Sequence, residues 1–554
     1  MNNLAIRRTR SAHDTALTIR HILERGVFQA PQQEIVYADR VRMTYATLAE
    51  RVNRLASALS ALGVEPGDTV AVMDWDSHRY LEAFFAVPMM GAVLHTVNIR
   101  ISPDQILYTI NHADDDVILV NAEFLPILDA IRDRIRAGVR FVLINDGSEK
   151  PQSKIEFSGE YEALLAKASP QFAFPALAED TRATTFYTTG TTGLPKGVYY
   201  SHRQLVLHTL AVCQALGNAP HASFAAGDVY MPVTPMFHVH AWGLPYVATM
   251  LGVKQVYPGR YVPDVLLGLI AREKVTFSHC VPTILSMMLG SPALKPGQLA
   301  GWKVIIGGSA LPASLARNAI EQGIDVIAGY GMSETCPILT LAHLRPHMRD
   351  WTAERKVSVL CRAGRPIPFV ELRIVDPGMK DVARDGASQG EVVVRAPWLT
   401  QGYLGEEERS EDLWQGGWLH TGDVGVVDGD GYLKIVDRIK DVVKTGGEWV
   451  SSLDIEDLVL HVPGVAEAAV VGVPDEKWGE RPVAFVVCRK DAQPTEDAIR
   501  KHVQAFADKG TISRYAVPDR VYFVEAIPKT SVGKLDKKVI RAQLVAHNQE
   551  ATAP

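Results

Sequence analysis

The feature that most constrains the fold of this chain is a repeated switch between two hydrophobic patterns in its first half. Residues 67–76 (GDTVAVMDWD) and 93–99 (VLHTVNI) are short apolar runs that predict buried strands. Residues 77–92 (SHRYLEAFFAVPMMGA) between them are helix-like, and residues 102–121 repeat the helix–strand order, with Ser102-Pro103 as a helix start. This order predicts a parallel sheet covered by helices, which is an α/β fold.

The pattern changes after about Gly364. Residues 369–376, 390–396 and 417–438 alternate apolar and polar side chains and carry Asp-Gly turns, so they predict antiparallel strands. The chain has 554 residues, which is enough for more than one domain and for a large core in at least one of them.

A third region follows the charged segment 437–441 (DRIKD). A helix is expected to begin at Ser451 or Ser452 and to stop before Pro463-Gly464, with its apolar residues on one face. The remaining elements expected here are strands at 466–475 and 481–490 and a helix at 495–509. The C-terminal part is therefore expected to be a small α+β domain that follows a charged linker.

Composition excludes several classes of protein. The formal net charge is −6 and charges of both signs are mixed along the chain, which does not indicate a nucleic-acid-binding tail or a polybasic membrane patch. The first residues carry arginines without an apolar segment behind them, and no apolar run has the length of a membrane span. Five scattered cysteines predict neither a disulfide framework nor a zinc site. The expectation is a cytoplasmic protein with reduced thiols.

Residues 187–198 (YTTGTTGLPKGV) combine glycines, threonine hydroxyls and a lysine directly after an apolar run. Glycines let a backbone turn tightly and point its N–H groups at an anion, so the stretch has the parts of a phosphate-binding loop. It is not a P-loop, because Pro195 precedes Lys196 and Gly197 stands where the magnesium-binding hydroxyl is required. A plain flexible loop is the alternative interpretation.

The stretch resembles the signature loop of the adenylate-forming superfamily, which contains acyl-CoA synthetases, firefly-type luciferases and peptide-synthetase adenylation domains. Further motifs follow in the usual order of that superfamily: PMFHVHAWGLP (235–245), GGSAL (307–311), GYGMSET (329–335), TGD (421–423), DRIKD (437–441), GGEWVSS (446–452) and PKTSVGKLDKK (528–538). The resemblance covers nearly the whole chain.

The resemblance implies a large N-terminal domain of parallel-sheet αβ layers with a distorted antiparallel β-barrel, and a small mobile α+β C-terminal domain. We expect the N-terminal domain at 1–437, the hinge at 438–441 and the C-terminal domain at 442–554. The DRIKD segment read without the resemblance is a charged linker, which a hinge also requires.

The resemblance also implies which residues bind the nucleotide. Asp423 resembles the acid that binds both ribose hydroxyls, and Arg438 is expected to support it. Tyr330 is expected to stack on adenine. The full set implied by the resemblance is Thr188, Thr189, Gly190, Thr191, Thr192, Lys196, Gly308, Ser309, Ala310, Tyr330, Gly331, Asp423 and Arg438. Without the motif context, Asp423 could cap a turn and Tyr330 could belong to an ordinary core.

Four residues carry the chemistry implied by the resemblance. Glu334 is expected to bind Mg²⁺, Thr335 to donate to the α-phosphate, and His238 to lie beside the substrate carboxylate and the pyrophosphate exit. Lys534 matches the lysine that bridges the carboxylate and the α-phosphate during adenylation alone. Taken singly, Glu334 could be a solvated loop acid, Lys534 a surface lysine, and the histidine a packing residue.

Two further sets follow from the resemblance. The acyl pocket is expected to contain His238, Trp242, Gly307, Gly329 and Met332. Trp242 matches a tryptophan that acts as a gate in long-chain enzymes. The coenzyme A and hinge residues are expected to be Lys440, Gly446, Gly447, Glu448 and Trp449. The two glycines suit a narrow thiol tunnel.

The motifs GGEWVSSLDIE and FHVHAWGLP are similar to those of bacterial medium- and long-chain fatty acyl-CoA synthetases and of methylthiopropionate-CoA ligases. They imply activation of a carboxylic acid by ATP and Mg²⁺ through an acyl-AMP, then thioester formation with coenzyme A. A medium-chain fatty acid is the expected substrate, with methylthiopropionate or another short or branched acid as the alternative. The motifs also leave open acyl transfer to a non-CoA acceptor, luciferase-like oxidation, and nucleotide-binding regulation without catalysis. Monomers and homodimers both occur in the superfamily.

Overall fold

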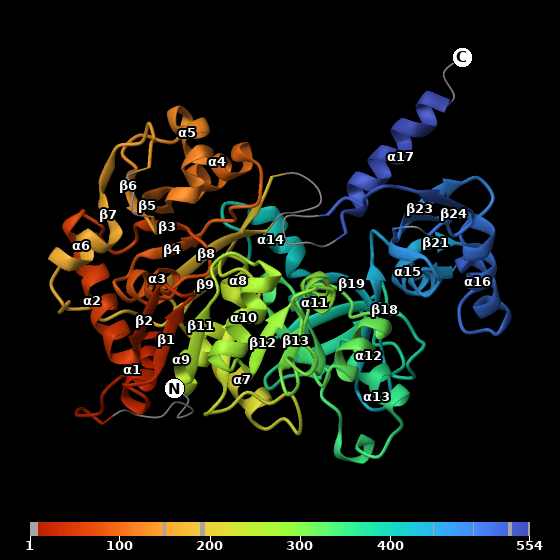
Figure 1. The fold of residues 1–554 in the computed structure, drawn as a ribbon, viewed down its shortest axis with the longest axis horizontal. Helices are drawn as coiled ribbons and strands as arrows, with labels where there is room; N and C mark the ends of the chain where they lie inside the picture. The colour runs from red at the N-terminus through yellow and green to blue at the C-terminus, as the bar shows by residue number, and fades with distance from the viewer. Residues whose placement is uncertain are drawn as a thin grey trace, which may run out of the picture.

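The fold is described from a computed structural model that covers residues 9–147, 151–188, 194–446, 448–490, 492–529 and 535–551, with side chains described as far as residue 544. Four sheets make up the described structure. Figure 1 shows the sheets from the first three-quarters of the chain side by side, and the C-terminal sheet with α15 and α16 at one end of the molecule.

The first large sheet has seven strands in the order β7-β6-β5-β3-β4-β8-β9. All neighbours are parallel except the β8–β9 hairpin. Its strands are β3 (Thr69–Met73), β4 (Val93–Thr96), β5 (Asp115–Asn121), β6 (Arg140–Ile144), β7 (Phe157–Glu160), β8 (Arg182–Thr188) and β9 (Lys196–Ser201). The predicted parallel sheet is therefore confirmed, and strands β3, β4 and β5 fall within the apolar runs that predicted them.

A second large sheet has nine strands in the order β16-β15-β14-β13-β12-β10-β11-β1-β2. Its centre is parallel from β14 to β1, and the pairs at both ends are antiparallel. Its strands are β1 (Glu34–Tyr37), β2 (Val41–Thr44), β10 (Val229–Pro232), β11 (Lys254–Tyr257), β12 (Phe277–Cys280), β13 (Lys303–Ile306), β14 (Asp325–Gly331), β15 (Ile338–Leu341) and β16 (Arg365–Pro366).

Helices pack against the two large sheets, except α14, which contacts β19. Those before residue 218 are α1 (Arg20–Gln29), α2 (Tyr45–Ala61), α3 (His78–Met89), α4 (Pro103–His112), α5 (Leu125–Ile131), α6 (Tyr161–Lys167) and α7 (His202–Gly217). Those that follow are α8 (Val239–Trp242), α9 (Leu244–Leu251), α10 (Pro263–Glu273), α11 (Pro282–Leu289), α12 (Ala313–Glu321), α13 (Ala353–Leu360) and α14 (Glu407–Leu413). The start predicted at Ser102-Pro103 is confirmed, because Ser102 caps α4 and forms a capping box with Gln105.

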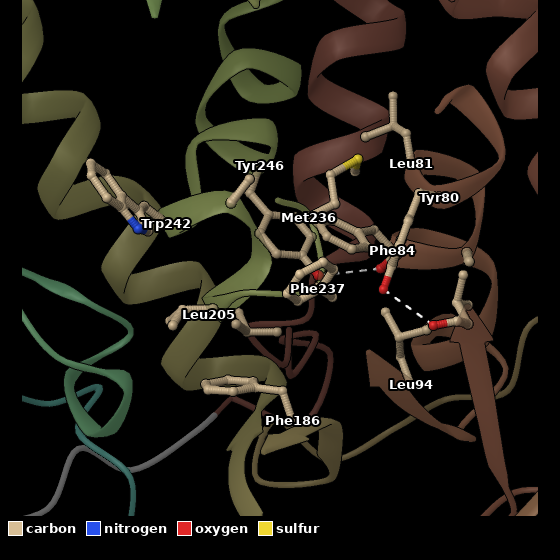
Figure 2. Packing of buried hydrophobic residues seen from close by; sticks show 14 of the residues in the cluster. Tyr80, Leu81, Phe84, Leu94, Phe186, Leu205, Met236, Phe237, Trp242 and Tyr246 are labelled. Carbon is tan, nitrogen blue, oxygen red and sulfur yellow. Dashed lines mark hydrogen bonds between the residues drawn. The ribbon is translucent and has the colours of Figure 1, made fainter. Parts of the chain in front are cut away.

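Helix α3 lies at the centre of the molecule. All twelve of its residues are buried, and it contacts β3, β4 and β8 of the seven-stranded sheet and β1 of the nine-stranded sheet. A helix that is buried on every side belongs inside a large core, and its charged residues Arg79 and Glu82 are paired with groups of opposite charge. The main hydrophobic cluster accordingly joins residues of both sheets and their helices, among them Phe186 of β8, Phe84 of α3 and Tyr246 of α9 (Figure 2).

The antiparallel region predicted after Gly364 is a sheet of four strands in the order β17-β18-β19-β20. Its strands are β17 (Glu371–Val375), β18 (Gly390–Arg395), β19 (Leu419–Val427) and β20 (Leu433–Arg438). An isolated bridge between Gly364 and Leu433 links its β20 edge to the segment before β16.

The C-terminal sheet begins at β21, five residues after β20 ends. Its elements are β21 (Val443–Thr445), β22 (Glu448–Val450), α15 (Ser452–Leu460), β23 (Val465–Asp475), β24 (Gly479–Cys488), α16 (Glu496–Asp508), β25 (Arg520–Phe523) and α17 (Lys537–Ala551). Ser451 caps α15 and Thr495 caps α16, so both predicted helix starts are confirmed.

All five cysteines are free. Among the residues described, none of the helices is both long and apolar enough to cross a bilayer.

Candidate active site

One polar cluster lies where β14 of the nine-stranded sheet meets β19 and β20 of the four-stranded sheet. It contains Tyr330, Asp423 and Arg438. Asp423 lies inside β19 opposite Arg438 at the end of β20, so the alternative in which it caps a turn is wrong. The Tyr330 hydroxyl, near the end of β14, donates to Asp423 Oδ2 at 2.6 Å, and Arg438 Nε lies 2.6 Å from Oδ1. The carboxylate is buried, so it is held in one orientation by a neutral donor and a charged donor.

The two partners of Asp423 are both protonated donors. Burial and the Asp423 carboxylate raise the pKa of Tyr330 well above its usual value. The phenol therefore stays neutral and remains a hydrogen-bond donor. Asp423 also raises the pKa of Arg438. A carboxylate that accepts two such bonds can exchange one of them for the paired hydroxyls of a ribose.

Gly308, Ser309 and Ala310 follow β13 and are exposed, so their backbone is open to a planar ligand. Gly307, directly before them, is buried and donates its N–H to the carbonyl of Cys280 at 3.2 Å. The exposed turn therefore lies at the carboxyl end of a buried parallel strand, where ligands of open α/β sheets bind.

Glu334 lies in a second polar cluster. Tyr403 donates its hydroxyl to Glu334 Oε1 at 2.8 Å, and the Lys196 ammonium lies 4.3 Å from the centroid of the Tyr403 ring. The backbone N–H of Leu404 also donates to the carbonyl of Gly197 at 2.8 Å. These contacts bring the start of β9, and therefore the end of the predicted phosphate loop, next to the GYGMSET motif.

Tyr403 was not predicted from the sequence. It lies in a loop after β18, in the stretch LTQGYLG, which has no spacing that distinguishes a functional tyrosine from a structural one. The contact with Lys196 joins residues 207 positions apart, and such a contact comes from the tertiary structure alone.

Thr335 is fully buried and its hydroxyl is used within its own loop. It accepts from the N–H of Met332 at 3.0 Å and lies 2.5 Å from the carbonyl of Pro337. Its predicted contact with an α-phosphate stays a prediction. Across the described ranges, no group of three His, Cys, Asp or Glu residues could hold a metal ion by itself. Glu334 offers one hard oxygen, and Mg²⁺ beside a nucleotide usually takes its other ligands from phosphates and water.

The predicted phosphate loop closes a hairpin. Thr188 at the end of β8 pairs with Lys196 at the start of β9, so a strand does precede the loop as predicted. The predicted residues Thr189, Gly190, Thr191 and Thr192 lie outside the described part of the chain. Gly331, another predicted nucleotide residue, needs to be glycine, because a Cβ there would lie 1.8 Å from the carbonyl oxygen of Pro337.

The segment after β10 has an uncommon backbone. His238 is half-buried, and the next four residues, Val239 to Trp242, all have positive φ angles between 47° and 59°. A left-handed conformation costs about 1–2 kcal/mol for each L-residue, and it normally occurs at single positions. Such strain usually persists where a site requires one particular arrangement of side chains.

This turn places Trp242 against the predicted acyl pocket. A Cβ built on Gly307 would lie 2.9 Å from Trp242 Cη2 and 3.1 Å from the carbonyl oxygen of Gly329. The indole centroid is also 5.0 Å from that of His279. Figure 2 shows Trp242 to one side of Tyr246 and Phe237. The structure thus brings Trp242, Gly307 and Gly329 together, and Met332 packs against the main core cluster.

The predicted coenzyme A and hinge residues lie between the antiparallel sheet and the C-terminal sheet. Lys440 is exposed, and its carbonyl accepts from Arg541 at 3.3 Å. Gly446 has φ 60°, and a Cβ there would lie 2.7 Å from the ring of Tyr515. The close neighbour of Gly446 therefore belongs to the same C-terminal region of the chain.

Trp449 is partly exposed, and the carboxylate of its neighbour Glu448 accepts from Ser513 at 2.5 Å. Gly447 and Lys534 lie outside the described residues. Leu535, next to Lys534, forms a bridge with Lys529.

Known proteins match this chain over most of its length. The description "AMP-binding enzyme" matches residues 23–404, and "AMP-binding enzyme C-terminal domain" matches residues 454–534. The chain is 41% identical over 539 residues to a long-chain-fatty-acid–CoA ligase of Thermus thermophilus, covering 96% of each chain. It is 37% identical over 535 residues to a 3-methylmercaptopropionyl-CoA ligase of Ruegeria lacuscaerulensis, covering 95% of this chain and 97% of the relative.

Among solved structures, the chain resembles an anthranilate CoA ligase in complex with anthranoyl-AMP. The TM-score is 0.82 at 26% identity, covering 98% of this chain and 100% of that one.

Proposed function

The chain belongs to the family of AMP-binding enzymes, and from this premise we propose that it is an AMP-forming acyl-CoA ligase. It activates a carboxylic acid with ATP, releases pyrophosphate, and then transfers the acyl group to coenzyme A. The observation that carries the proposal is the convergence of Tyr330 and Arg438 on the buried Asp423 carboxylate, with Gly307 close to Gly329, the residue before Tyr330. The named activities of the relatives support the same reaction class.

In the first half-reaction, a substrate carboxylate attacks the α-phosphate and two negative charges must approach. Lys196 and the N–H groups of the 188–197 loop would hold the outer phosphates, and Asp423 would hold the ribose. Glu334 offers a hard oxygen ligand, so it fits Mg²⁺ together with phosphate oxygens, and that ion would neutralise phosphate charge. Lys534 would orient the carboxylate against the α-phosphate.

In the second half-reaction, a thiol must reach the acyl-AMP from another direction. We propose an N-terminal domain at 1–437, a hinge at 438–441 and a C-terminal domain at 442–554 that rotates about Lys440. The support is that sheet membership changes between Arg438 and Val443, and that Asp441 in this segment pairs with Arg541 of α17 at 2.7 Å. Rotation would turn the 446–452 segment toward the site.

The substrate is proposed to be a medium-chain fatty acid, and the apolar Trp242 beside Gly307 at the expected acyl site supports an aliphatic acid. A 3-methylthio acid is the second candidate, and the similarity to a 3-methylmercaptopropionyl-CoA ligase favours it. Pockets of this kind discriminate by about 1–3 kcal/mol per methylene, so several acids are expected to react. A cytoplasmic location and a homodimer are also part of the proposal, and fractionation and light scattering test them.

The test is acid-dependent release of pyrophosphate from ATP and magnesium, with and without coenzyme A, across short, medium, long, aromatic and methylthio acids. We expect turnover that requires coenzyme A and has its maximum at one aliphatic length. Release without any requirement for coenzyme A would keep the adenylation and contradict the thiol acceptor. A Lys534→Ala variant should lose adenylation by orders of magnitude. It should still form thioester from supplied acyl-AMP.

A further inference from the structure

Asp76 is a buried acid outside the residues discussed so far. It lies at the carboxyl end of β3, in the short connection to α3, and its side chain is 3% exposed. A buried carboxylate needs donors that compensate for lost solvation, so its partners indicate why it is there.

The Asp76 carboxylate has a donor on each oxygen. Oδ1 accepts from the backbone N–H of Met236 at 2.9 Å, and Oδ2 accepts from the hydroxyl of Tyr261 at 2.5 Å. Its carbonyl also accepts from the N–H of Gly259 at 2.9 Å. Asp76 follows β3 of the seven-stranded sheet, and all three donors follow β10 or β11 of the nine-stranded sheet. One side chain therefore joins the carboxyl ends of the two sheets.

Met236 is two residues before His238, and each residue of this short loop is held. Thr96 donates its hydroxyl to the carbonyl of Phe237 at 2.9 Å. The N–H of His238 donates to the carbonyl of Pro235 at 2.9 Å. The Arg100 guanidinium carbon lies 5.9 Å from the ring centroid of Phe237. The position of His238, and of the left-handed turn after it, therefore depends on a loop that Asp76 anchors.

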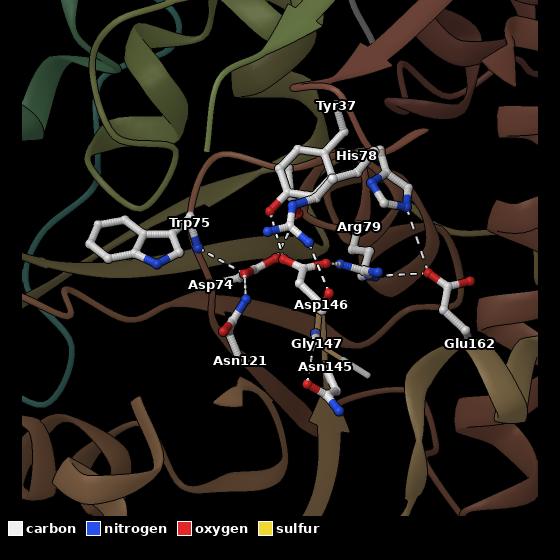
Figure 3. Close-up of polar contacts among 12 residues, drawn as sticks. Tyr37, Asp74, Trp75, His78, Arg79, Asn121, Asn145, Asp146, Gly147 and Glu162 are labelled. Carbon is white, nitrogen blue, oxygen red and sulfur yellow. Dashed lines mark hydrogen bonds and ion pairs between the residues drawn. The ribbon is translucent and has the colours of Figure 1, made fainter. Parts of the chain in front are cut away.

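Protonation of Asp76 would disturb this arrangement. An ionised carboxylate accepts a charge-assisted bond from both donors. A protonated carboxyl offers only neutral acceptors, which bind an N–H more weakly, and its added O–H needs an acceptor of its own. Burial raises the pKa of Asp76 to about 7, the bonds from Tyr261 and Met236 and the charge of Arg100 lower it, and the charge of Asp74 raises it. Asp74 belongs to a polar network at the same sheet edge, where Asn121 donates to it at 2.8 Å (Figure 3).

Four tyrosines also feel the charge of Asp76, and burial raises the pKa of each above its usual range: Tyr80, Tyr230, Tyr257 and Tyr261. They stay neutral wherever Asp76 titrates. His238 is a second titratable group on the same loop, so a test must separate the two.

We propose that Asp76 is a positioning residue, and that its ionised carboxylate holds the His238 loop in the arrangement that acyl activation requires. The proposal rests on the proposed function, because that function places His238 at the reacting carboxylate. Asp76 itself touches no reacting atom and acts through the backbone of Met236.

The experiment compares the wild-type enzyme with Asp76→Asn, Asp76→Ala and Tyr261→Phe. The pH profile of pyrophosphate release is measured over about pH 5.5–9 with octanoate, or with the fastest acid of the screen above. We expect kcat/KM for the acid to rise through an ionisation near the pKa of Asp76. Asp76→Asn is neutral at every pH, as the protonated carboxyl is, so its kcat/KM should stay near the low-pH level of the wild type and lose that ionisation.

The two remaining variants should change different features of the pH profile. Tyr261→Phe removes a bond that lowers the pKa of Asp76, so the ionisation should move to higher pH. Asp76→Ala should lower kcat/KM for the acid about tenfold or more at every pH, because the loop is misplaced. An unchanged ionisation in Asp76→Asn, or an unmoved midpoint in Tyr261→Phe, would overturn the proposal.

A second measurement does not depend on catalysis. Hydrogen exchange of a peptide that covers residues 233–238 should be faster in Asp76→Ala than in the wild type at neutral pH, with Asp76→Asn between the two. Equal exchange in all variants would contradict the anchoring role. If no acid supports pyrophosphate release in the wild type, the proposed function fails, and hydrogen exchange still decides the role of Asp76.

Discussion

The two ends of the candidate active site are held in different ways. At the nucleotide end, Asp423 and Glu334 are fixed by side chains from other strands and loops, namely Tyr330, Arg438 and Tyr403. At the acyl end, Trp242 is placed by a strained backbone turn and by apolar contact with Gly307. Hydrogen bonds and charge hold the side chains at the first end, and backbone conformation and packing hold them at the second. Mutations at the two ends should therefore impair different steps of the reaction.

The largest effect is expected at the nucleotide end. Asp423→Ala removes the acceptor of Tyr330 and the partner of Arg438, so adenylation should fall by about a thousandfold. Asp423→Asn keeps the shape and the bond from Tyr330 but loses the charge, so its loss should be intermediate. Acid-dependent ATP–pyrophosphate exchange measures both. An alanine variant that adenylates at the wild-type rate would remove Asp423 from the site.

At the acyl end, Gly307→Ala should change substrate binding and leave the nucleotide steps intact. The added methyl would lie 2.9 Å from Trp242 Cη2, so the indole must move. We expect KM for octanoate to rise about tenfold with little change in KM for ATP. The matched control is the same change in a Trp242→Ala background, where the penalty should shrink. An equal penalty in both backgrounds would show that the indole is not what the methyl meets.

His240 should make the folded protein less stable in acid. Its ring is fully buried among Phe84, Phe186, Tyr200 and Tyr246, and neither ring nitrogen has a partner among the described residues. Burial lowers the pKa of His240 to about 3, while an unfolded histidine titrates near its usual value of about 6.5. Below that pH the unfolded state therefore binds the extra proton, and stability falls as pH falls.

A His240→Phe variant removes this group. Between about pH 4 and 6 its unfolding free energy should depend on pH less steeply than that of the wild type, by about 1.4 kcal/mol per pH unit. Urea unfolding at several pH values measures the slope. Identical slopes would mean that His240 reaches water or a partner in the folded protein.

The smallest effect is expected from relief of the backbone strain in the left-handed turn at residues 239–242. Ala241 and Ala248 are both fully buried, but Ala241 has φ 47° in the left-handed turn, whereas Ala248 lies in the right-handed helix α9. Glycine removes the same methyl at both positions, and it relieves strain at Ala241 alone. Ala241→Gly should therefore be less destabilising than Ala248→Gly by about 1 kcal/mol. Equal losses in urea unfolding would argue against strain in the turn.

Prediction from the sequence succeeded where local patterns carry the information. The capped starts of α4 and α15 and the alternation of β17 to β20 follow from short-range rules, and the structure has them. The positions of Asp423 and Glu334 were inferred from ordered motifs. The role of Asp76 was not inferred, although an acid at the end of a buried strand was a visible signal.

The sequence by itself therefore determined the α/β class, the change to antiparallel strands after Gly364, and the residue types that suit adenylation chemistry. These properties depend on hydrophobic period and on side-chain chemistry, both of which are local. The tertiary structure alone decided that Tyr403 meets Glu334, that Trp242 covers Gly307, and that Asp76 anchors the loop before His238. Each of these contacts joins residues more than 60 positions apart, and such pairs are set by how whole sheets pack together.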